Sequence, residues 1–257
     1  MLIIKGYGVV GKSTERFLRF HTSYSQIEFD DPLLGISSKN IAAANWCVIC
    51  VPSPLINGWN DDSRVFAAIQ SAEQESFTGN YLVRSTLSIK SVEKLENLLG
   101  NRLIVWPEFI RANHWEKDSV DPPIVVLGGS QAERFESKFD LLTRTRVYLT
   151  GTREAMLLKL AANSFLSMKV VFANQLKQLC DHYTADYQTV INMLADDGRF
   201  GSSHWNVPGP DGSLGFGGHC FPKDSTTYKN ELQNAGIDAN MLEQMLIINH
   251  KLRGDLQ

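Results

Sequence analysis

The stretch Leu2-Ile3-Ile4-Lys5-Gly6-Tyr7-Gly8-Val9-Val10-Gly11 decides the fold class of this 257-residue chain. An apolar run is followed by glycines in the pattern G-x-G-x-x-G, and then by an amphipathic segment that reaches about Phe20. This order of strand, glycine turn and helix is the fingerprint of a dinucleotide-binding βαβ unit, in which the first N–H groups of the helix bind a pyrophosphate. The residues predicted to form this turn are Gly6, Gly8, Val9, Val10 and Gly11.

An acidic residue follows at the distance that the fingerprint requires. The apolar run Gln26–Asp30 predicts a second strand, and Asp30 ends it about 20 residues after the glycines. In this fingerprint the acid binds the ribose 2′-OH. Because an acid would repel a 2′-phosphate, it favours NAD over NADP as the cofactor. Asp30 is the first candidate and Asp31 the second.

The same glycines also fit a second nucleotide-binding pattern. Gly6 to Ser13 satisfies G-x4-G-K-[ST], the phosphate-binding loop of nucleotide triphosphatases. Such an enzyme needs a magnesium-binding Asp at the end of a strand. The later apolar runs end instead in Val51-Pro52 and Ser85-Thr86. We therefore interpret the glycines as a dinucleotide turn, with a triphosphatase as the less favoured alternative.

Apolar runs and helical patterns alternate through the first part of the chain. This alternation predicts a Rossmann-like, doubly wound parallel sheet over residues 1–150. From about Thr152 to Tyr183 the pattern becomes one long helix, and shorter helical stretches follow to the end. Residues 151–257 are therefore expected to form an all-helical domain around a long central helix. The further predicted strands are Trp46–Val51, Tyr81–Thr86, Arg102–Phe109, Ile124–Leu127 and Arg146–Leu149, and the further predicted helices are 64–75, 186–195, 225–234 and 240–253, with one more from about Gln131.

Composition is that of a globular protein with a substantial core. Hydrophobic residues make up 43%, charged residues 21%, and the net charge is −3, so no nucleic-acid or membrane surface is indicated. No secretory pattern and no membrane-spanning run is expected. Four cysteines do not form a disulfide framework, which favours a reducing, cytoplasmic setting. Cys47 and Cys50 lie in an apolar run and are interpreted as core residues.

A second glycine-rich stretch, Gly215-Phe216-Gly217-Gly218-His219-Cys220-Phe221-Pro222-Lys223-Asp224, surrounds one cysteine. Glycines allow the backbone to approach a ligand closely. A nearby cation or helix N-terminus lowers the pKa of a thiol, and such a cysteine is a candidate covalent nucleophile. Pro222 suits the first position of a helix, which would place Lys223 and Asp224 in the first turn. A merely packed cysteine is the alternative.

This stretch resembles the active-site cysteine segment of the UDP-glucose/GDP-mannose dehydrogenase family, which reads close to GFGGxCFPKD. Cys50–Pro54 is similar to the family's CVPTP, and Pro107–Arg111 to its PEFLR. Lys159–Lys169 has the family's K-x-A-A-N-x-F-L-x-x-K helix motif, and Phe172–Asn174 the F-x-N that follows it. Asp197-Gly198-Arg199 is similar to a segment whose arginine reaches the sugar nucleotide.

The resemblance implies NAD-dependent oxidation of the C6 hydroxyl of a nucleotide sugar to a carboxylate in polysaccharide biosynthesis, with UDP-glucose as the favoured substrate. The cysteine would trap the aldehyde, and the lysine and amide of the long helix would stabilise the oxyanion. The implied catalytic residues are Cys220, Lys159, Asn163, Asp224, Glu108 and Thr86. To the glycine turn and Asp30 the resemblance adds the cofactor-binding residues Pro52, Ser53, Ser85, Thr86 and Lys223. The implied substrate-binding residues are Glu108, Phe109, Ile110, Arg111, Lys159, Asn163, Arg199, Phe216, Gly217 and Cys220.

The chain also departs from the family pattern. The connection from Pro32 to Asn45 is short where the family has a helical insertion, the loop 207–215 is longer, and the family's second α/β domain is absent. A catalytically impaired sugar-nucleotide-binding protein is therefore an alternative, as is an enzyme whose partner chain supplies the missing domain. The resemblance further implies a homodimer formed through the 152–183 helix. No metal is expected.

Overall fold

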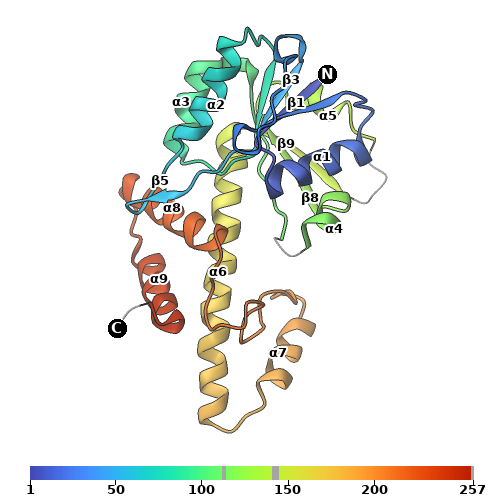
Figure 1. Cartoon of the computed structure of the whole chain (residues 1–257). Coiled ribbons are helices and arrows are strands. Elements are labelled where there is room, and N and C mark those ends of the chain that lie inside the picture. The colour runs from blue at the N-terminus through green and yellow to red at the C-terminus, as the bar shows by residue number, and fades with distance from the viewer. Residues whose placement is uncertain (112–113, 141–144, 256–257) are drawn as a thin grey trace. The chain divides into compact units, whose positions relative to one another are not determined.

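The protein was analysed as a computed structural model, which describes residues 1–111, 114–140 and 145–255 and divides into two compact units (Figure 1). The first unit comprises Met1–Ile56 and Asn60–Lys159. The second comprises Asn57–Trp59 and the chain from Leu160 onward. The boundary therefore lies inside the long helix, whereas the expected domain junction at residue 150 precedes that helix.

A seven-stranded sheet in the order β2-β1-β3-β6-β7-β8-β9 forms the centre of the first unit. Its strands run parallel from β2 to β7, which confirms the predicted fold class. One detail differs, since β7 and β8 pair antiparallel while β8 and β9 are parallel. Apolar runs carry no information on strand direction, so this reversal could not be predicted from them. The strands are β1 (Leu2–Lys5), β2 (Ile27–Asp30), β3 (Trp46–Ile49), β6 (Asn80–Val83), β7 (Leu103–Val105), β8 (Ile124–Gly128) and β9 (Arg146–Thr150).

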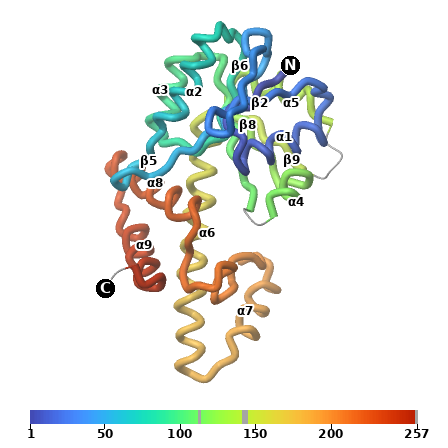
Figure 2. The backbone as a smooth tube through the Cα atoms, in the orientation of Figure 1, coloured from blue at the N-terminus to red at the C-terminus, as the bar shows by residue number. Residues whose placement is uncertain are grey.

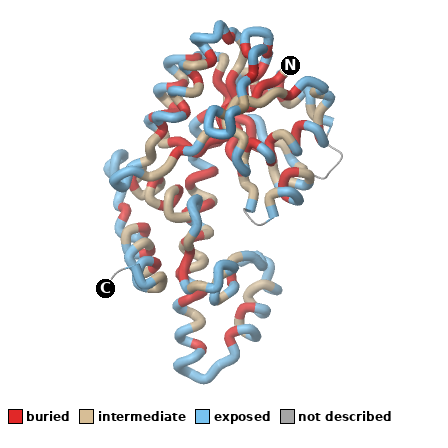
Figure 3. The backbone as a smooth tube through the Cα atoms, viewed as in Figure 1, coloured by how far each residue is buried: buried red, intermediate tan, exposed pale blue. Residues whose placement is uncertain are grey.

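Helices cover both faces of this sheet, with α2 and α3 on one side and α1, α4 and α5 on the other (Figure 1). Covered strands bury side chains on both faces, which is why they are apolar throughout; Figure 3 shows the burial concentrated along them. Leu2, Ile3 and Ile4 of β1 are all fully buried. The helices are α1 (Val9–His21), α2 (Ser63–Gln74), α3 (Ile89–Leu99), α4 (Trp115–Val120) and α5 (Ala132–Glu136).

Several elements of the first part of the chain were not predicted, among them α3, α4 and the hairpin of β4 and β5. Helix α3 begins after Ser88, whose hydroxyl accepts a hydrogen bond from the Ser91 N–H at 3.2 Å as an N-cap does. The hairpin of β4 (Leu55–Ile56) and β5 (Trp59–Asn60) turns at Asn57 and Gly58, both with positive φ. Asn-Gly is the preferred pair for such a turn, so the signal was present in the sequence.

The second unit is helical, as predicted. Helix α6 (Thr152–His182) is its longest element (Figure 2), followed by α7 (Tyr187–Asp196), α8 (Cys220–Asn234) and α9 (Asn240–Arg253). One apolar cluster joins α6 to α7 through Cys180, Tyr187 and Trp205. Another joins α6 to α9 and includes Phe216 of the glycine-rich stretch. Helix α8 begins at Cys220, two positions earlier than Pro222 suggested, because proline is tolerated throughout a first turn.

Helix α6 also corrects one expectation from composition. With 31 residues and an apolar window it is long and apolar enough to cross a membrane, although no such run was expected. The helices of soluble cores pass the same test, and 44% of this window is buried inside the protein. Its length and apolarity therefore have an explanation in the packing of the second unit.

Phe135 should be a major contributor to the stability of the first unit. Its ring is fully buried against Trp46, Trp106 and Phe139. Phe135→Ala should lower the free energy of unfolding by about 3–5 kcal/mol, measured by urea denaturation. Leu98→Ala, on the exposed side of α3, should change it by less than about 0.5 kcal/mol. Equal unfolding midpoints for the two variants would contradict this account of the core.

Candidate functional site

The glycine turn between β1 and α1 has the geometry of a dinucleotide-binding turn. Gly6 has φ +90°, and a Cβ there would lie 2.8 Å from the Cys50 carbonyl oxygen. A Cβ on Gly11 would lie 2.2 Å from the Gly6 carbonyl oxygen. A Cβ on Gly8, by contrast, would meet no described atom within 4 Å. Gly6 and Gly11 are thus required for close packing, while Gly8 leaves the open side of the turn accessible to a ligand.

Helix α1 begins directly after this turn. Gly8 is its N-cap, and no side chain of the described residues caps it, so its first N–H groups are available to an anion. Lys12 already lies within the helix, with Nζ 5.9 Å from the centre of the Tyr7 ring. The Ser13 hydroxyl is buried and accepts a hydrogen bond from Ser119 at 2.7 Å. A triphosphatase would need that hydroxyl at a magnesium ion, so the geometry favours a dinucleotide-binding turn over a triphosphatase loop.

The two acids at the end of β2 face different partners. Asp30 pairs with the buried Lys5, whose Nζ lies 2.6 Å from its carboxylate. Asp31 accepts a hydrogen bond from the Tyr7 N–H at 2.7 Å and so lies against the glycine turn. Asp31 therefore contacts the turn directly, while its other carboxylate oxygen accepts a hydrogen bond from the Leu33 N–H at 3.0 Å. Binding of a ribose by either acid stays a prediction.

Hydroxyl groups fix the carboxyl ends of β3 and β6. Ser53 donates a hydrogen bond to the Thr86 carbonyl at 2.6 Å, and Ser85 donates to the Val51 carbonyl at 2.6 Å. These two predicted cofactor residues thus shape the strand ends beside Pro52. Within the described ranges, no protein group bonds the Thr86 hydroxyl, although Thr86 is only 8% exposed. That hydroxyl therefore remains available to a ligand or a water.

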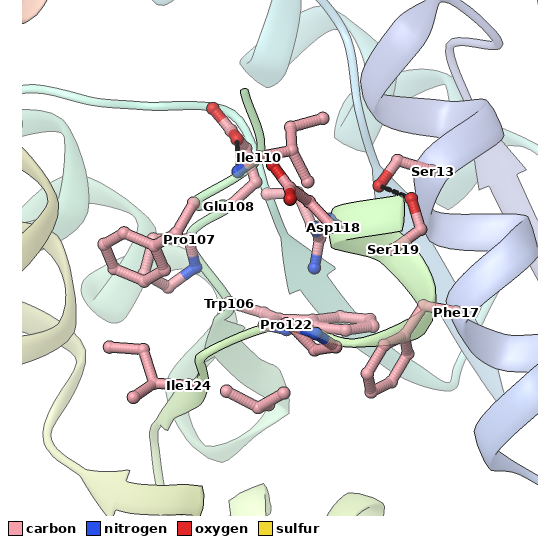
Figure 4. Close-up of a pocket in the computed structure, with 13 residues that line it drawn as sticks. Ser13, Phe17, Trp106, Pro107, Glu108, Ile110, Asp118, Ser119, Pro122 and Ile124 are labelled. Atoms are coloured by element: carbon pink, nitrogen blue, oxygen red, sulfur yellow. Dashed lines mark hydrogen bonds between the residues drawn. The ribbon is translucent and has the colours of Figure 1, made fainter. Parts of the chain in front are cut away.

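Glu108 and Lys159 form a buried ion pair in the first unit. Lys159 Nζ lies 3.0 Å from Glu108 Oε1, and Glu108 Oε2 accepts a hydrogen bond from the Ile110 N–H at 2.9 Å. Burial alone would raise the pKa of Glu108, but the charge and hydrogen bond of Lys159 outweigh it and hold that pKa below its usual value. Figure 4 shows Glu108 on the loop after Trp106, where it lines a small pocket. Glu108 is therefore a carboxylate, the form required of a general base.

Asp224 has a comparable environment in the second unit. It is fully buried and accepts hydrogen bonds from Lys223 Nζ and Asn163 Nδ2, each at 2.5 Å. Cys220 is exposed at the first position of α8, four residues before Asp224 on the same helix. A helix N-terminus stabilises anions, which is the environment a thiolate nucleophile requires.

The backbone before Cys220 is held by two buried asparagines. Asn249 Oδ1 accepts from the Phe216 N–H at 2.7 Å, and its Nδ2 donates to the Phe216 carbonyl at 3.0 Å. Asn174 Oδ1 accepts from the Gly215 N–H at 3.1 Å. A Cβ on Gly217 would lie 2.7 Å from the Arg253 guanidinium, which would have to shift to admit a side chain. Sequence reasoning missed Asn249, because an amide inside an amphipathic helix gives no local signal.

Comparison with known proteins agrees with these features. Residues 153–251 match the central domain of the UDP-glucose/GDP-mannose dehydrogenase family. The predicted resemblance is confirmed, and the matched region includes Lys159, Asn163, Cys220 and Asp224.

Relatives of this family match the rest of the chain as well. UDP-glucose 6-dehydrogenase of Rhizobium meliloti is 29% identical over 81% of this chain and 51% of its own length. UDP-glucose 6-dehydrogenase YwqF of Bacillus subtilis is 27% identical over 92% of this chain and 54% of its own length. The chain thus spans about half the length of these relatives.

Solved structures show the same fold. A UDP-glucose dehydrogenase from Pyrobaculum islandicum superposes with a TM-score of 0.81 at 22% identity, covering 97% of this chain and 68% of that one. A 3-hydroxyisobutyrate dehydrogenase from Mycobacterium tuberculosis superposes with a TM-score of 0.76 at 14% identity, covering 99% and 94%. At these identities the likeness establishes the fold alone.

The remaining predicted substrate residues of the family pattern are less enclosed. Arg111 is held by Asp118, which accepts from its guanidinium at 2.6 and 3.0 Å. Arg199 is exposed and pairs with Asp197. The Phe109 ring centre lies 5.5 Å from Lys159 Nζ. Both arginines keep much of their surface in solvent, where a phosphate could reach them.

Glu108→Gln should destabilise the protein, because it removes the carboxylate that pairs with the buried Lys159. The expected loss at pH 7 is about 3 kcal/mol of unfolding free energy, measured by urea denaturation. The pKa of Glu108 is lower in the folded state, so the pair stabilises above the unfolded value near 4.5 and loses this contribution as pH falls through the folded value. The difference between wild type and variant should therefore shrink below about pH 4.5. A difference that is constant from pH 7 to pH 3 would contradict this.

Proposed function

We propose that this chain oxidises the C6 hydroxyl of a nucleotide sugar to a carboxylate with NAD as the oxidant, and that UDP-glucose is the first substrate to test. One observation carries the proposal. Helix α6 holds Lys159, which pairs with Glu108, and four residues later Asn163, which bonds Asp224. Residues four apart share one face of a helix. Both buried carboxylates of the implied chemistry thus have one partner on this helix, and Asp224 lies four residues after the exposed Cys220.

The glycine turn fits the cofactor. Gly8 leaves the turn open, the α1 N–H groups suit a pyrophosphate, and the Asp31 carboxylate on the turn suits a ribose. An acid at this place disfavours a 2′-phosphate, so NAD is preferred to NADP. NAD would supply the hydride acceptor for the two oxidations, with one NAD molecule reduced in each. Every other role falls to side chains of this chain.

The first oxidation removes a proton from the C6 hydroxyl as its hydride departs. Asp224 and Lys159 would pass that proton on by way of a water, and the product is an aldehyde. The amide of Asn163 and the ammonium of Lys159 are donors that would stabilise an alkoxide oxygen. Because both donors are already buried and bonded, they need little reorganisation when charge develops.

The second oxidation requires Cys220. Its thiolate would add to the aldehyde carbon, and the resulting thiohemiacetal would lose a second hydride to become a thioester. Water would then attack the thioester carbonyl, break the carbon–sulfur bond and release the carboxylate and the thiolate. Glu108, ionised because its pKa is lowered, would accept the proton of that water, and the Thr86 hydroxyl would orient it.

Substrate recognition would use the basic and backbone groups around these residues. Arg111 and Arg199 would bind phosphate oxygens, and Phe216 and Gly217 would border the sugar at the loop before Cys220. The relatives named above act on UDP-glucose, which makes that nucleotide sugar the first choice. A panel of nucleotide sugars, assayed by NADH absorbance, would decide among substrates.

The length of the chain leaves two alternatives to be tested together with this activity. Since it covers about half of its relatives, a partner chain would be needed if their remaining part is essential for binding the nucleotide. Alternatively, the chain binds a nucleotide sugar without oxidising it. Mass measurement with and without UDP-glucose, combined with a binding titration, separates these possibilities. The expected setting is the cytoplasm, where reduced cysteines persist.

Cys220→Ser should stop the oxidation at the aldehyde stage. The serine hydroxyl is a far weaker nucleophile, so carboxylate formation should fall by at least about a thousandfold, while NAD binding is unchanged. Product analysis by mass spectrometry and an NAD titration measure the two effects. Cys180→Ala, which removes a buried thiol, is the control and should keep carboxylate formation. Undiminished carboxylate formation in Cys220→Ser would overturn the proposed mechanism.

We further propose that α6 forms a homodimer interface. Phe165, Phe172 and Leu179 recur every seven residues and are 66%, 55% and 54% exposed. A seven-residue apolar repeat is the pattern by which helices pair. Such a stripe is costly to leave in water, so a second copy of the helix is the simplest cover.

The dimer can be tested by placing charge on this stripe. Phe172→Glu should convert the dimer to a monomer in light scattering or analytical ultracentrifugation at micromolar concentration. Met241→Glu, on the exposed side of α9, is the matched control and should leave the mass unchanged. A wild-type protein that is monomeric, or a Phe172→Glu variant that stays dimeric, would refute an interface at this stripe.

A further inference from the structure

Arg84 is a buried cation that forms no ion pair, and whose Nε has no hydrogen-bond partner, among the described residues. It follows β6 directly and is only 6% exposed. Its guanidinium lies 4.1 Å from the centre of the Trp106 ring, and its Nε is fully buried with no hydrogen-bond acceptor. In the described ranges no carboxylate forms an ion pair with it. The sequence analysis placed Arg84 in a strand and gave it no functional role, and the proposed mechanism does not use it.

A buried guanidinium that is stacked on one tryptophan ring needs further stabilisation. Removing a cation from water costs several kcal/mol, whereas stacking on a desolvated tryptophan returns about 2 kcal/mol. A guanidinium also carries five N–H donors that seek acceptors. Another group must therefore bond the buried side of Arg84.

A small cavity provides the space for that group. It measures about 30 Å³, and Arg84, Glu108, Ser13 and Ser119 are among the residues that line it (Figure 4). This volume suffices for one or two water molecules and excludes a phosphate or a sugar. Glu108 and Asp118 also line the cavity, so an anion would be repelled. Water is the occupant that both the size and the charge of the cavity favour.

We propose that a buried water in this cavity bridges Arg84 Nε to the Glu108 carboxylate, and that Arg84 is thereby the residue that positions Glu108. The Ser13–Ser119 pair supplies further polar contacts for this water. Stacking on Trp106 fixes the guanidinium plane, so the direction of the Nε–H is fixed as well. The role of Glu108 toward its reacting water rests on the proposed function, but the bridge itself does not.

The charges around Glu108 agree with this assignment. Lys159 of α6 pairs with it directly, and Arg84 acts on it in the same sense, lowering its pKa further. The buried thiol of Cys50 at the end of β3 also faces it, and burial raises the pKa of that thiol to about 11, so it is uncharged at neutral pH. Asp118 across the cavity is occupied by its ion pair with Arg111. Arg84 is thus the second cation that keeps Glu108 ionised.

The test compares Arg84→Met with Arg84→Lys and Arg102→Met. Arg84→Met keeps an apolar contact with Trp106 but removes the charge, so the titration of Glu108 should move to higher pH by about one unit. Carbon-13 NMR of labelled glutamate, with the Glu108 signal assigned by its loss in Glu108→Gln, measures this shift. Arg84→Lys should restore most of the wild-type titration. Arg102→Met removes another stacked arginine, which pairs with Glu73 rather than Glu108, and should leave the titration unchanged.

Activity gives a second, separate readout. The acid limb of the kcat/KM profile should move to higher pH in Arg84→Met with little change in KM. If the chain forms no carboxylate at all, the proposed function fails while the NMR titration still tests the bridge. An unchanged Glu108 titration in Arg84→Met would overturn the inference.

A high-resolution crystal structure tests the water without any substitution. Density for a water within hydrogen-bonding distance of Arg84 Nε and of a Glu108 oxygen is expected. An empty cavity, or direct contact of Arg84 with Glu108, would refute the bridge even if Arg84→Met failed to fold.

Discussion

The buried ion pair of Lys159 and Glu108 is the constraint on which the chemistry of the first unit depends. Both side chains are less than 10% exposed, so each charge has lost most of its hydration. Their attraction compensates for that loss only where further hydrogen bonds complete it. The Ile110 N–H supplies one such bond, and the proposed water from Arg84 supplies another. The pair therefore fixes the loop after β7 to the first turns of α6 and keeps a carboxylate ionised where burial alone would neutralise it.

The Asp224 carboxylate has also lost its hydration by burial, and a different set of partners compensates for that loss. Lys223, its neighbour in sequence, supplies the charge, and the Asn163 amide supplies a neutral donor. Each of the two carboxylates, Glu108 and Asp224, has one partner on α6. The backbone hydrogen bonds of the helix set the spacing between these partners, Lys159 and Asn163. A long helix suits this task because its geometry does not depend on loops. The rest of α6 must then be apolar enough to anchor it in the helical unit, which explains its composition.

Much of this arrangement could be predicted from the sequence. Glycine spacing and apolar runs identified the sheet, and the bounds of β1 and α9 were predicted to the residue. The acids at the end of β2 show where this reasoning stops. Neighbouring strand residues point to opposite faces, so the spacing alone could not tell that Asp30 turns to Lys5 and Asp31 to the glycine turn. The roles of Arg84 and Asn249 were not predicted for a related reason, since they depend on contacts with residues distant in sequence.

Helix α6 shows how one apolar sequence can satisfy several demands at once. A lipid-spanning helix would have to place Lys159 and Asn163 against hydrocarbon or against other protein, and here both are buried on protein partners. Lys169 also has protein partners, because its Nζ donates to the Phe200 and Gly201 carbonyls and lies 4.3 Å from the Trp205 ring centre. The exposed large apolar side chains of α6 are Leu157 and Leu158 near its first turns and the stripe of Phe165, Phe172 and Leu179, rather than the whole circumference that lipid would require. A seven-residue period is the pattern by which helices pair, so the stripe supports the homodimer proposed above.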